Sequence, residues 1–256
     1  MRQVIRKWGL ICVLALSSLA QLKAQAPVQQ QFDAANVLFR EQKYAEAANA
    51  YQHLIDSGYQ ADNLYYNAGN AYLKLNKTGP AVYSFEKALK LNPNNQAAAN
   101  NLQIASLRIK DNVDPLPLLF FQEWFITLEK IHSPNGWAIG CIVVFWILAI
   151  AFMLYRFVPR FHHKFIRWGM YGITVFFLGY LTMSIYVYSV ATDDSTAIVM
   201  QTSSKVKEAP DAKSRDMFEA REGMKVEILD TAAGFSKIQL ADGKTGWIPV
   251  QSIKVL

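Results

Sequence analysis

Histidine and cysteine are the residues in this sequence best suited to catalysis or metal binding, and they are few and scattered. The sequence contains His53, His132, His162, His163, Cys12 and Cys141. Only His162 and His163 are close together, and adjacent side chains point to different sides of a helix or strand, so they chelate a metal poorly. No nucleophile motif, phosphate-binding loop or metal-ligand spacing is present. We therefore predict no catalytic residue, metal site or cofactor, and expect the protein not to be an enzyme.

Asparagine, aromatic and basic side chains recur in the N-terminal half, and these side chains suit protein recognition. The candidate partner-binding residues are Asn36, Arg40, Tyr66, Asn70, Lys74 and Arg108. Asparagine amides can hydrogen-bond the backbone of an extended peptide, and aromatic rings can pack against its side chains. The sequence therefore predicts a surface that binds partner proteins.

Residues 28–112 must position these side chains, and their pattern is that of a helical repeat. Small and apolar residues recur about 34 residues apart, which is the period of the tetratricopeptide repeat (TPR). The recurring pairs are Ala35 with Gly69, Ala47 with Ala81, Tyr51 with Phe85, and Leu54 with Ala88. Residues 96–110 add a further first helix, which would cap the stack. We predict an all-α TPR superhelix over residues 28–112, with the candidate residues on its concave face.

Two asparagines of this face also resemble part of the carboxylate clamp of chaperone-binding TPR proteins. Asn36 and Asn67 occupy two of the clamp positions. Ala97 and Asn101 stand where the clamp needs basic residues. We therefore expect no binding of a C-terminal carboxylate, and interpret Asn67 as a residue that packs or bonds locally.

Two apolar stretches predict a two-helix transmembrane hairpin, over residues 137–157 and 168–191. At about 1.5 Å rise per residue, each stretch can cross a hydrocarbon core about 30 Å thick. Residues 158–167 form a short basic turn, which the positive-inside rule retains in the cytoplasm. Residues 113–136 are an amphipathic joint, which we expect to lie in the membrane interface, the alternative being a helix packed back on the repeats.

The N-terminus and the charge distribution agree with this topology. Residues 1–24 have the basic start and short apolar core of a signal peptide, with cleavage expected after Ala24 rather than retention as an anchor. Both soluble domains would then face the periplasm from the inner membrane. The net charge is +6, but much of the excess lies in the leader and the basic turn. We therefore expect no nucleic-acid partner.

Residues 195–256 change to short alternating stretches separated by glycine-containing turns, which predicts an all-β bacterial SH3-like barrel. Residues 197–210 are interpreted as its first hairpin, and the Gly246-Trp247 pair is the most specific part of the pattern. Trp247 could line a ligand groove or lie in the core. We expect the core, because so small a domain needs a large buried aromatic side chain.

The order of leader, TPR units, two-span hairpin and SH3-like domain resembles the BatE family of the Bacteroides aerotolerance (Bat) operons, over essentially the full length. The resemblance implies a periplasm-facing inner-membrane protein that acts with von Willebrand factor A-domain membrane proteins in tolerance of oxygen or other stress. It implies no biochemical activity. We therefore expect a membrane scaffold whose TPR groove binds partner proteins and whose hairpin contacts lipid. The alternative is an envelope sensor whose SH3-like domain binds peptidoglycan peptides.

Overall fold

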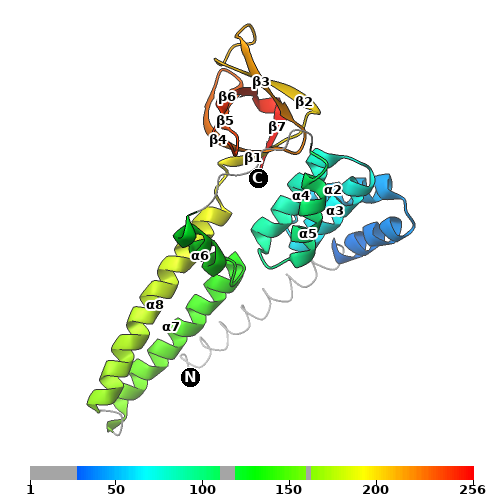
Figure 1. The fold of residues 1–256 in the computed structure, drawn as a ribbon. Coiled ribbons are helices and arrows are strands. Elements are labelled where there is room, and N and C mark those ends of the chain that lie inside the picture. The colour runs from blue at the N-terminus through cyan, green and yellow to red at the C-terminus, as the bar shows by residue number, and fades with distance from the viewer. Residues whose placement is uncertain (1–27, 110–118, 160–162) are drawn as a thin grey trace, which may run out of the picture.

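The computed structural model describes residues 28–109, 119–159 and 163–256. These residues form a helical repeat region, a hairpin of two long apolar helices, and a C-terminal antiparallel sheet (Figure 1). The predicted signal peptide, residues 1–24, lies outside the described residues, as do residues 110–118 of the joint and 160–162 of the basic turn. The three-part fold predicted from the sequence is confirmed.

The repeat region is built on the recurring small and apolar positions. Its helices are residues 28–40, α2 (Tyr44–Asp56), α3 (Asp62–Lys74), α4 (Thr78–Leu91) and α5 (Gln96–Ser106). Ala35, Ala47, Ala81 and Phe85 are all fully buried. A Cβ atom on Gly69 would lie 2.6 Å from Cε1 of Phe85, so α3 and α4 cross where only glycine fits.

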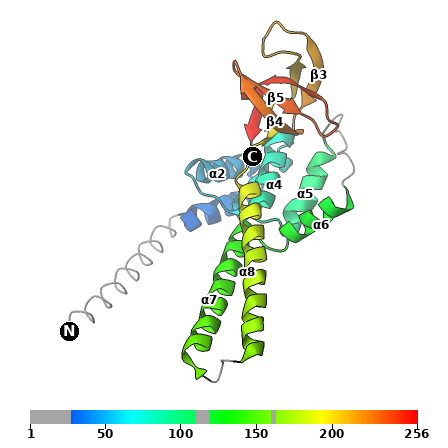
Figure 2. The same ribbon diagram turned by 90° about the vertical axis from the view of Figure 1, so that its left-hand side faces the viewer.

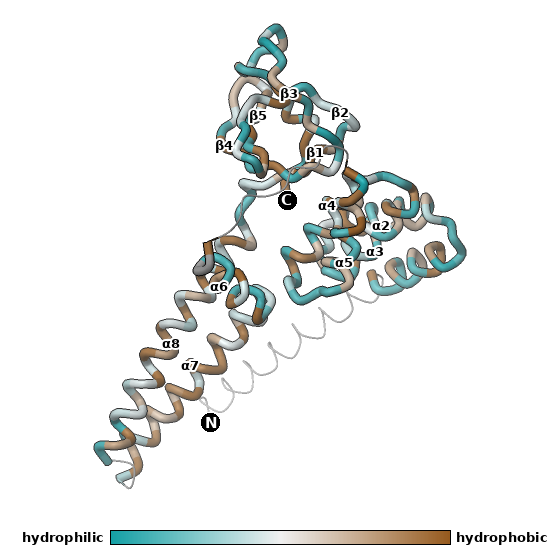
Figure 3. Tube along the Cα trace, in the orientation of Figure 1, coloured by the Kyte–Doolittle hydropathy of each residue, from teal (hydrophilic) through white to brown (hydrophobic). Residues whose placement is uncertain are grey.

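The two apolar helices form an antiparallel hairpin, α7 (Pro134–Phe157) and α8 (Lys164–Ala191), preceded by the shorter α6 (Phe120–Glu129). Both α7 and α8 are long and apolar enough to cross a membrane (Figure 3). Ser133 starts α7 slightly before the predicted span, because its hydroxyl accepts a hydrogen bond from the Gly136 N–H. The helix α8 begins at Lys164, inside the predicted basic turn, because Lys and Arg are good helix formers.

Close contact between α7 and α8 depends on one glycine. Tyr180 of α8 lies directly against Gly140 of α7, and its ring is 4.7 Å from the ring of Trp137, measured between centroids. By contrast, a Cβ atom on Gly169, Gly172 or Gly179 would have no neighbour within 4 Å. These three glycines of α8 therefore face away from α7.

The C-terminal domain is a seven-stranded antiparallel sheet with the order β3-β2-β6-β5-β4-β1-β7. The strands are β1 (Thr196–Val199), β2 (Ser203–Lys207), β3 (Asp216–Arg221), β4 (Lys225–Ala232), β5 (Phe235–Gln239), β6 (Thr245–Pro249) and β7 (Ile253–Val255). The predicted first hairpin, residues 197–210, is wrong: β1 pairs with β4 and β7, whereas β2 pairs with β3 and β6. The reason is that β1 is buried along Ala197, Ile198 and Val199, between two strands and against a helix.

The SH3-like domain packs directly on α4 of the repeat region. Ile198 and Leu256 belong to the same buried cluster as Tyr83 and Phe85 of α4. In both views the SH3-like domain and the repeats lie at the same end of the hairpin (Figures 1 and 2). The two soluble domains therefore form one body on one side of the α7–α8 hairpin.

Polar contacts reinforce the same interface. The Glu222 carboxylate accepts a hydrogen bond of 2.8 Å from the Gly79 N–H at the start of α4. Lys225 forms an ion pair of 2.8 Å with Glu86, and the Lys254 ammonium lies 4.3 Å above the ring of Tyr83. Burial raises the pKa of Tyr83 to about 12.

Candidate partner-binding site

The first helices of successive repeats are joined by pairs of asparagines. The Asn36 side-chain oxygen accepts hydrogen bonds from the Tyr51 hydroxyl at 2.7 Å and from the Asn67 amide at 2.9 Å. One repeat further on, the Asn101 amide donates to the Asn70 oxygen at 2.6 Å. Burial raises the pKa of Tyr51 to about 12. Asn36 and Asn70, predicted as partner-binding residues, therefore use these side-chain oxygens to hold the repeats in register.

The basic candidates lie at the ends of the first helices. Arg40 and Lys74 are exposed, and each is the last residue of its helix. Arg108 is exposed as well, but its guanidinium donates hydrogen bonds of 3.1 Å to the Leu73 carbonyl and to the Asn76 side chain. Arg108 therefore caps the C-terminal end of α3, and Arg40 and Lys74 are the cations most open to a ligand.

The same asparagine bond occurs in two successive repeats. Arg40, Lys74 and Arg108 therefore occupy equivalent positions, one per repeat. Tyr66 lies on the same helices but is half-buried, with its ring 6.2 Å from that of Phe85. Ile104, near the C-terminal end of α5, has an exposed apolar side chain. We call Arg40, Tyr66, Lys74 and Ile104 the first-helix surface. Its cations and apolar groups suit an extended, acidic polypeptide segment.

Trp247 of the SH3-like domain lies outside the core, contrary to the sequence-based expectation. Along β6 the side chains alternate: Ile248 is fully buried, whereas Trp247 is half-buried on the opposite side of the strand. Its cross-strand neighbours are Lys207 and Lys237. Gly246 is the inward position, where a Cβ atom would lie only 2.5 Å from Cγ1 of Val206. The glycine of the Gly-Trp pair therefore serves core packing, and the tryptophan faces outward.

Replacing Trp247 and Ile248 separately tests this orientation. We expect Trp247→Ala to lower the free energy of unfolding by about 1 kcal/mol, because a half-buried side chain loses little contact. Ile248→Ala should cost about 2–5 kcal/mol, because it leaves a cavity in the core. Denaturant unfolding of the full chain, followed by near-ultraviolet circular dichroism, measures both. If Trp247→Ala lowered the free energy of unfolding more than Ile248→Ala does, Trp247 would have to lie in the core.

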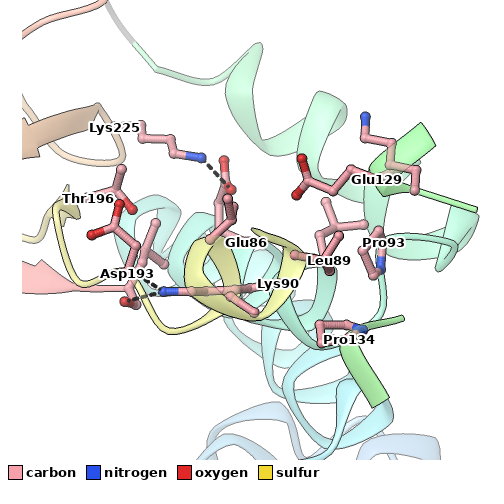
Figure 4. Close-up of a pocket in the computed structure, with 15 residues that line it drawn as sticks. Glu86, Leu89, Lys90, Pro93, Glu129, Pro134, Asp193, Thr196 and Lys225 are labelled. Atoms are coloured by element: carbon pink, nitrogen blue, oxygen red, sulfur yellow. Dashed lines mark hydrogen bonds and ion pairs between the residues drawn. The ribbon is translucent and has the colours of Figure 1, made fainter. Parts of the chain in front are cut away.

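A pocket of about 420 Å³ lies where the repeats, the hairpin and the SH3-like domain meet (Figure 4). Lys90 of α4 projects into this region and donates hydrogen bonds to main-chain oxygens of Asp193 and Leu256. Glu129, at the end of α6, also lines the pocket, and burial raises the pKa of its carboxyl. No local sequence pattern marked this pocket, because its walls come from segments far apart in the chain.

The histidines and the cysteine of α7 are dispersed. His53, His132 and His163 are exposed on different parts of the molecule, and His162 lies outside the described residues. Cys141 is a free thiol in α7. Across residues 28–109, 119–159 and 163–256, no three His, Cys, Asp or Glu side chains gather in a way that could hold a metal ion.

Fold and site define a chain with two interaction modules carried beside an apolar helical hairpin. Comparison with known families gives the same two modules: residues 63–95 match the tetratricopeptide repeat model and residues 202–254 match the bacterial SH3 domain model. These modules are typical of protein–protein and peptidoglycan-related binding. No curated protein matches the chain.

Similarity to solved structures is local. One matching chain, titled "Structure of NlpC2 from Trichomonas vaginalis", is 14% identical, with a TM-score of 0.23. The match covers 25% of this chain and 26% of that chain. At this TM-score it carries no argument about fold or function.

Proposed function

We propose that this protein is a non-enzymatic scaffold of the inner membrane whose first-helix surface binds partner proteins. The observation that carries the proposal is the series of basic residues at equivalent positions of successive repeats, on helices that the asparagine pairs hold in register. A rigid surface binds an extended segment at a lower entropic cost than a flexible one does. The occupant is an extended, acidic segment of a partner protein, with its carboxylates against Arg40 and Lys74.

The arrangement of the soluble domains supports this role. The SH3-like domain covers α4, a second helix, and leaves Arg40 and Lys74 on the first helices exposed. The glycine face of α8, with Gly169, Gly172 and Gly179, is open to another membrane helix. The resemblance to the BatE family suggests von Willebrand factor A-domain membrane proteins as partners, in an aerotolerance or stress-related complex.

The position of Trp247 favours a second candidate function, that of an envelope sensor whose SH3-like domain binds peptidoglycan peptides. Its half-exposed ring lies between two lysines, which gives the outer face of β6 both an apolar and a cationic group. Incubation of the detergent-solubilised full chain with isolated cell wall distinguishes the two. Retention by wall that Trp247→Ala abolishes favours the sensor, whereas capture of membrane proteins without wall retention favours the scaffold.

The basic turn between α7 and α8 predicts on which side of the membrane each part of the chain lies. Reporter fusions placed after Asn112 and after Leu256 should both be exported, and a fusion at His163 should be cytoplasmic, because Arg160, Lys164 and Arg167 resist translocation. Paired alkaline phosphatase and green fluorescent protein fusions measure this directly. A cytoplasmic reporter after Leu256 would contradict the periplasmic placement of the soluble domains.

A further inference from the structure

The outer ends of the hairpin helices and α4 enclose a second, smaller pocket of about 200 Å³. The hairpin contributes Pro134 and Asn135 from the start of α7, and Tyr188, Ala191 and Thr192 from the end of α8. The repeats contribute Gln60, Tyr65, Lys87, Lys90 and Leu91. In a membrane-spanning hairpin, helix ends lie at the level of the lipid headgroups. The pocket therefore lies at the membrane surface on the side of the soluble domains.

Lys87 is the group in this pocket whose charge is least satisfied. It is half-buried, and within the described residues it forms no ion pair. Its nearest aromatic ring, that of Tyr83, lies 6.0 Å from the ammonium, at the limit for a cation–π contact. Burial lowers the pKa of Lys87, as do the positive charges of Lys90 and Lys254, whereas the negative charge of Asp194 raises it. Asp194 offsets part of the repulsion but forms no ion pair with Lys87, so a further anion would stabilise this half-buried cation.

Lys90 can contribute to the same anion. Its ammonium has three N–H donors, and two of them bond to main-chain oxygens of Asp193 and Leu256. Within the described residues the third donor forms no hydrogen bond, and Lys90 lines the same pocket as Lys87. Tyr65 supplies a hydroxyl, and Leu91 and Tyr188 supply apolar surface. Two ammonium groups above an apolar wall match the phosphate and glycerol of a phospholipid.

We propose that this pocket binds the phosphate of a phospholipid from the leaflet nearest the soluble domains, with Lys87 and Lys90 as its ligands. The inference rests on the proposed membrane anchoring. The bound lipid would fix the repeats against the outer ends of α7 and α8, and so set the height of the first-helix surface above the membrane. The exposed aromatic rings of Trp124 and Phe125 on α6 are suited to the same interface.

Native mass spectrometry of the full chain in detergent tests the site, with phosphatidylglycerol, diacylglycerol of the same acyl chains, and inorganic phosphate as separate probes. We expect the wild-type chain to retain one phosphatidylglycerol at concentrations where diacylglycerol is not retained. Inorganic phosphate should bind at least about tenfold more weakly than the lipid, because it lacks the apolar contacts. Equal retention of diacylglycerol, or phosphate binding as tight as lipid binding, would overturn the proposal.

Substitutions locate the site. Lys87→Gln should weaken phosphatidylglycerol binding about tenfold or more, because a charge-assisted bond is lost, whereas Lys87→Arg should retain the lipid. The control is Lys77→Gln, an exposed lysine at the opposite end of α4, which should bind as the wild type does. Lys87→Gln binding that equals the wild type would refute the site. Membrane fractionation of the same samples separates this failure from a failure of anchoring itself, because a chain absent from membranes fails before any lipid is added.

Discussion

Ile198→Asp is expected to detach the SH3-like domain from the repeats. Ile198 is fully buried in the cluster that contains Tyr83 and Phe85 of α4, although its own strand belongs to the SH3-like domain. An unpaired carboxylate at this position costs several kcal/mol. Each kcal/mol shifts the midpoint of a cooperative unit of this size by about 2–4 °C, so we expect the melting temperature of the soluble body to fall by at least about 6 °C.

Differential scanning calorimetry of the full chain measures this effect. The wild-type soluble domains should unfold together, because they share one buried cluster, and Ile198→Asp should separate the transition into two. The matched control is Val255→Asp on the adjacent strand β7, whose side chain is exposed. If both substitutions shift the midpoint equally, the two domains are not one body in solution.

The sequence predicted the repeat fold well because helix crossings leave a local signature. Ala35, Ala47 and Phe85 recur at the TPR period since each must fit a close contact between neighbouring helices, and all three are fully buried. Strand alternation in residues 195–256 is likewise a local property. The pairing of β1 is not, because it depends on strands β4 and β7 far along the chain.

Docking of the SH3-like domain on α4 left a faint sequence signal. Tyr83 is buried, whereas Asn49, the equivalent residue one repeat earlier, is exposed. An aromatic residue on the outer side of only one repeat indicates that something covers that repeat. The sequence alone does not say that the cover is Ile198 and Leu256.

The candidate partner-binding residues stay a prediction. The structure adds that the side-chain oxygens of Asn36 and Asn70 accept hydrogen bonds from Asn67 and Asn101. The recurrence of Asn67 as Asn101, one repeat later, could have indicated a structural pair. Trp247 was misjudged for a related reason: strict alternation with Ile248 places it on the outer face of β6.

Reversal of two charges on the first-helix surface should have the largest effect on partner binding. In Arg40→Glu/Lys74→Glu, two exposed cations become carboxylates that repel an acidic segment, and we expect partner affinity to fall about a hundredfold or more. The substitutions leave the asparagine pairs and the Arg108 contacts intact, so helicity should be unchanged. Surface plasmon resonance on the captured partner, with circular dichroism of the same samples, measures both quantities.

A control with the same change in net charge is Lys213→Glu/Arg215→Glu, which alters two exposed basic residues between β2 and β3 of the SH3-like domain. It should bind partners about as tightly as the wild-type chain does. Equal losses in the two double variants would mean that overall charge, rather than the first-helix surface, governs binding.

Crosslinking in intact membranes, followed by quantitative mass spectrometry of the tagged full-length chain, determines whether the first-helix surface selects the partners. We expect Arg40→Glu/Lys74→Glu to lose the membrane proteins captured by the wild-type chain, and Trp247→Ala to retain them. If the charge-reversed chain retained those proteins and Trp247→Ala lost them, the SH3-like domain and not the first-helix surface would select the partners.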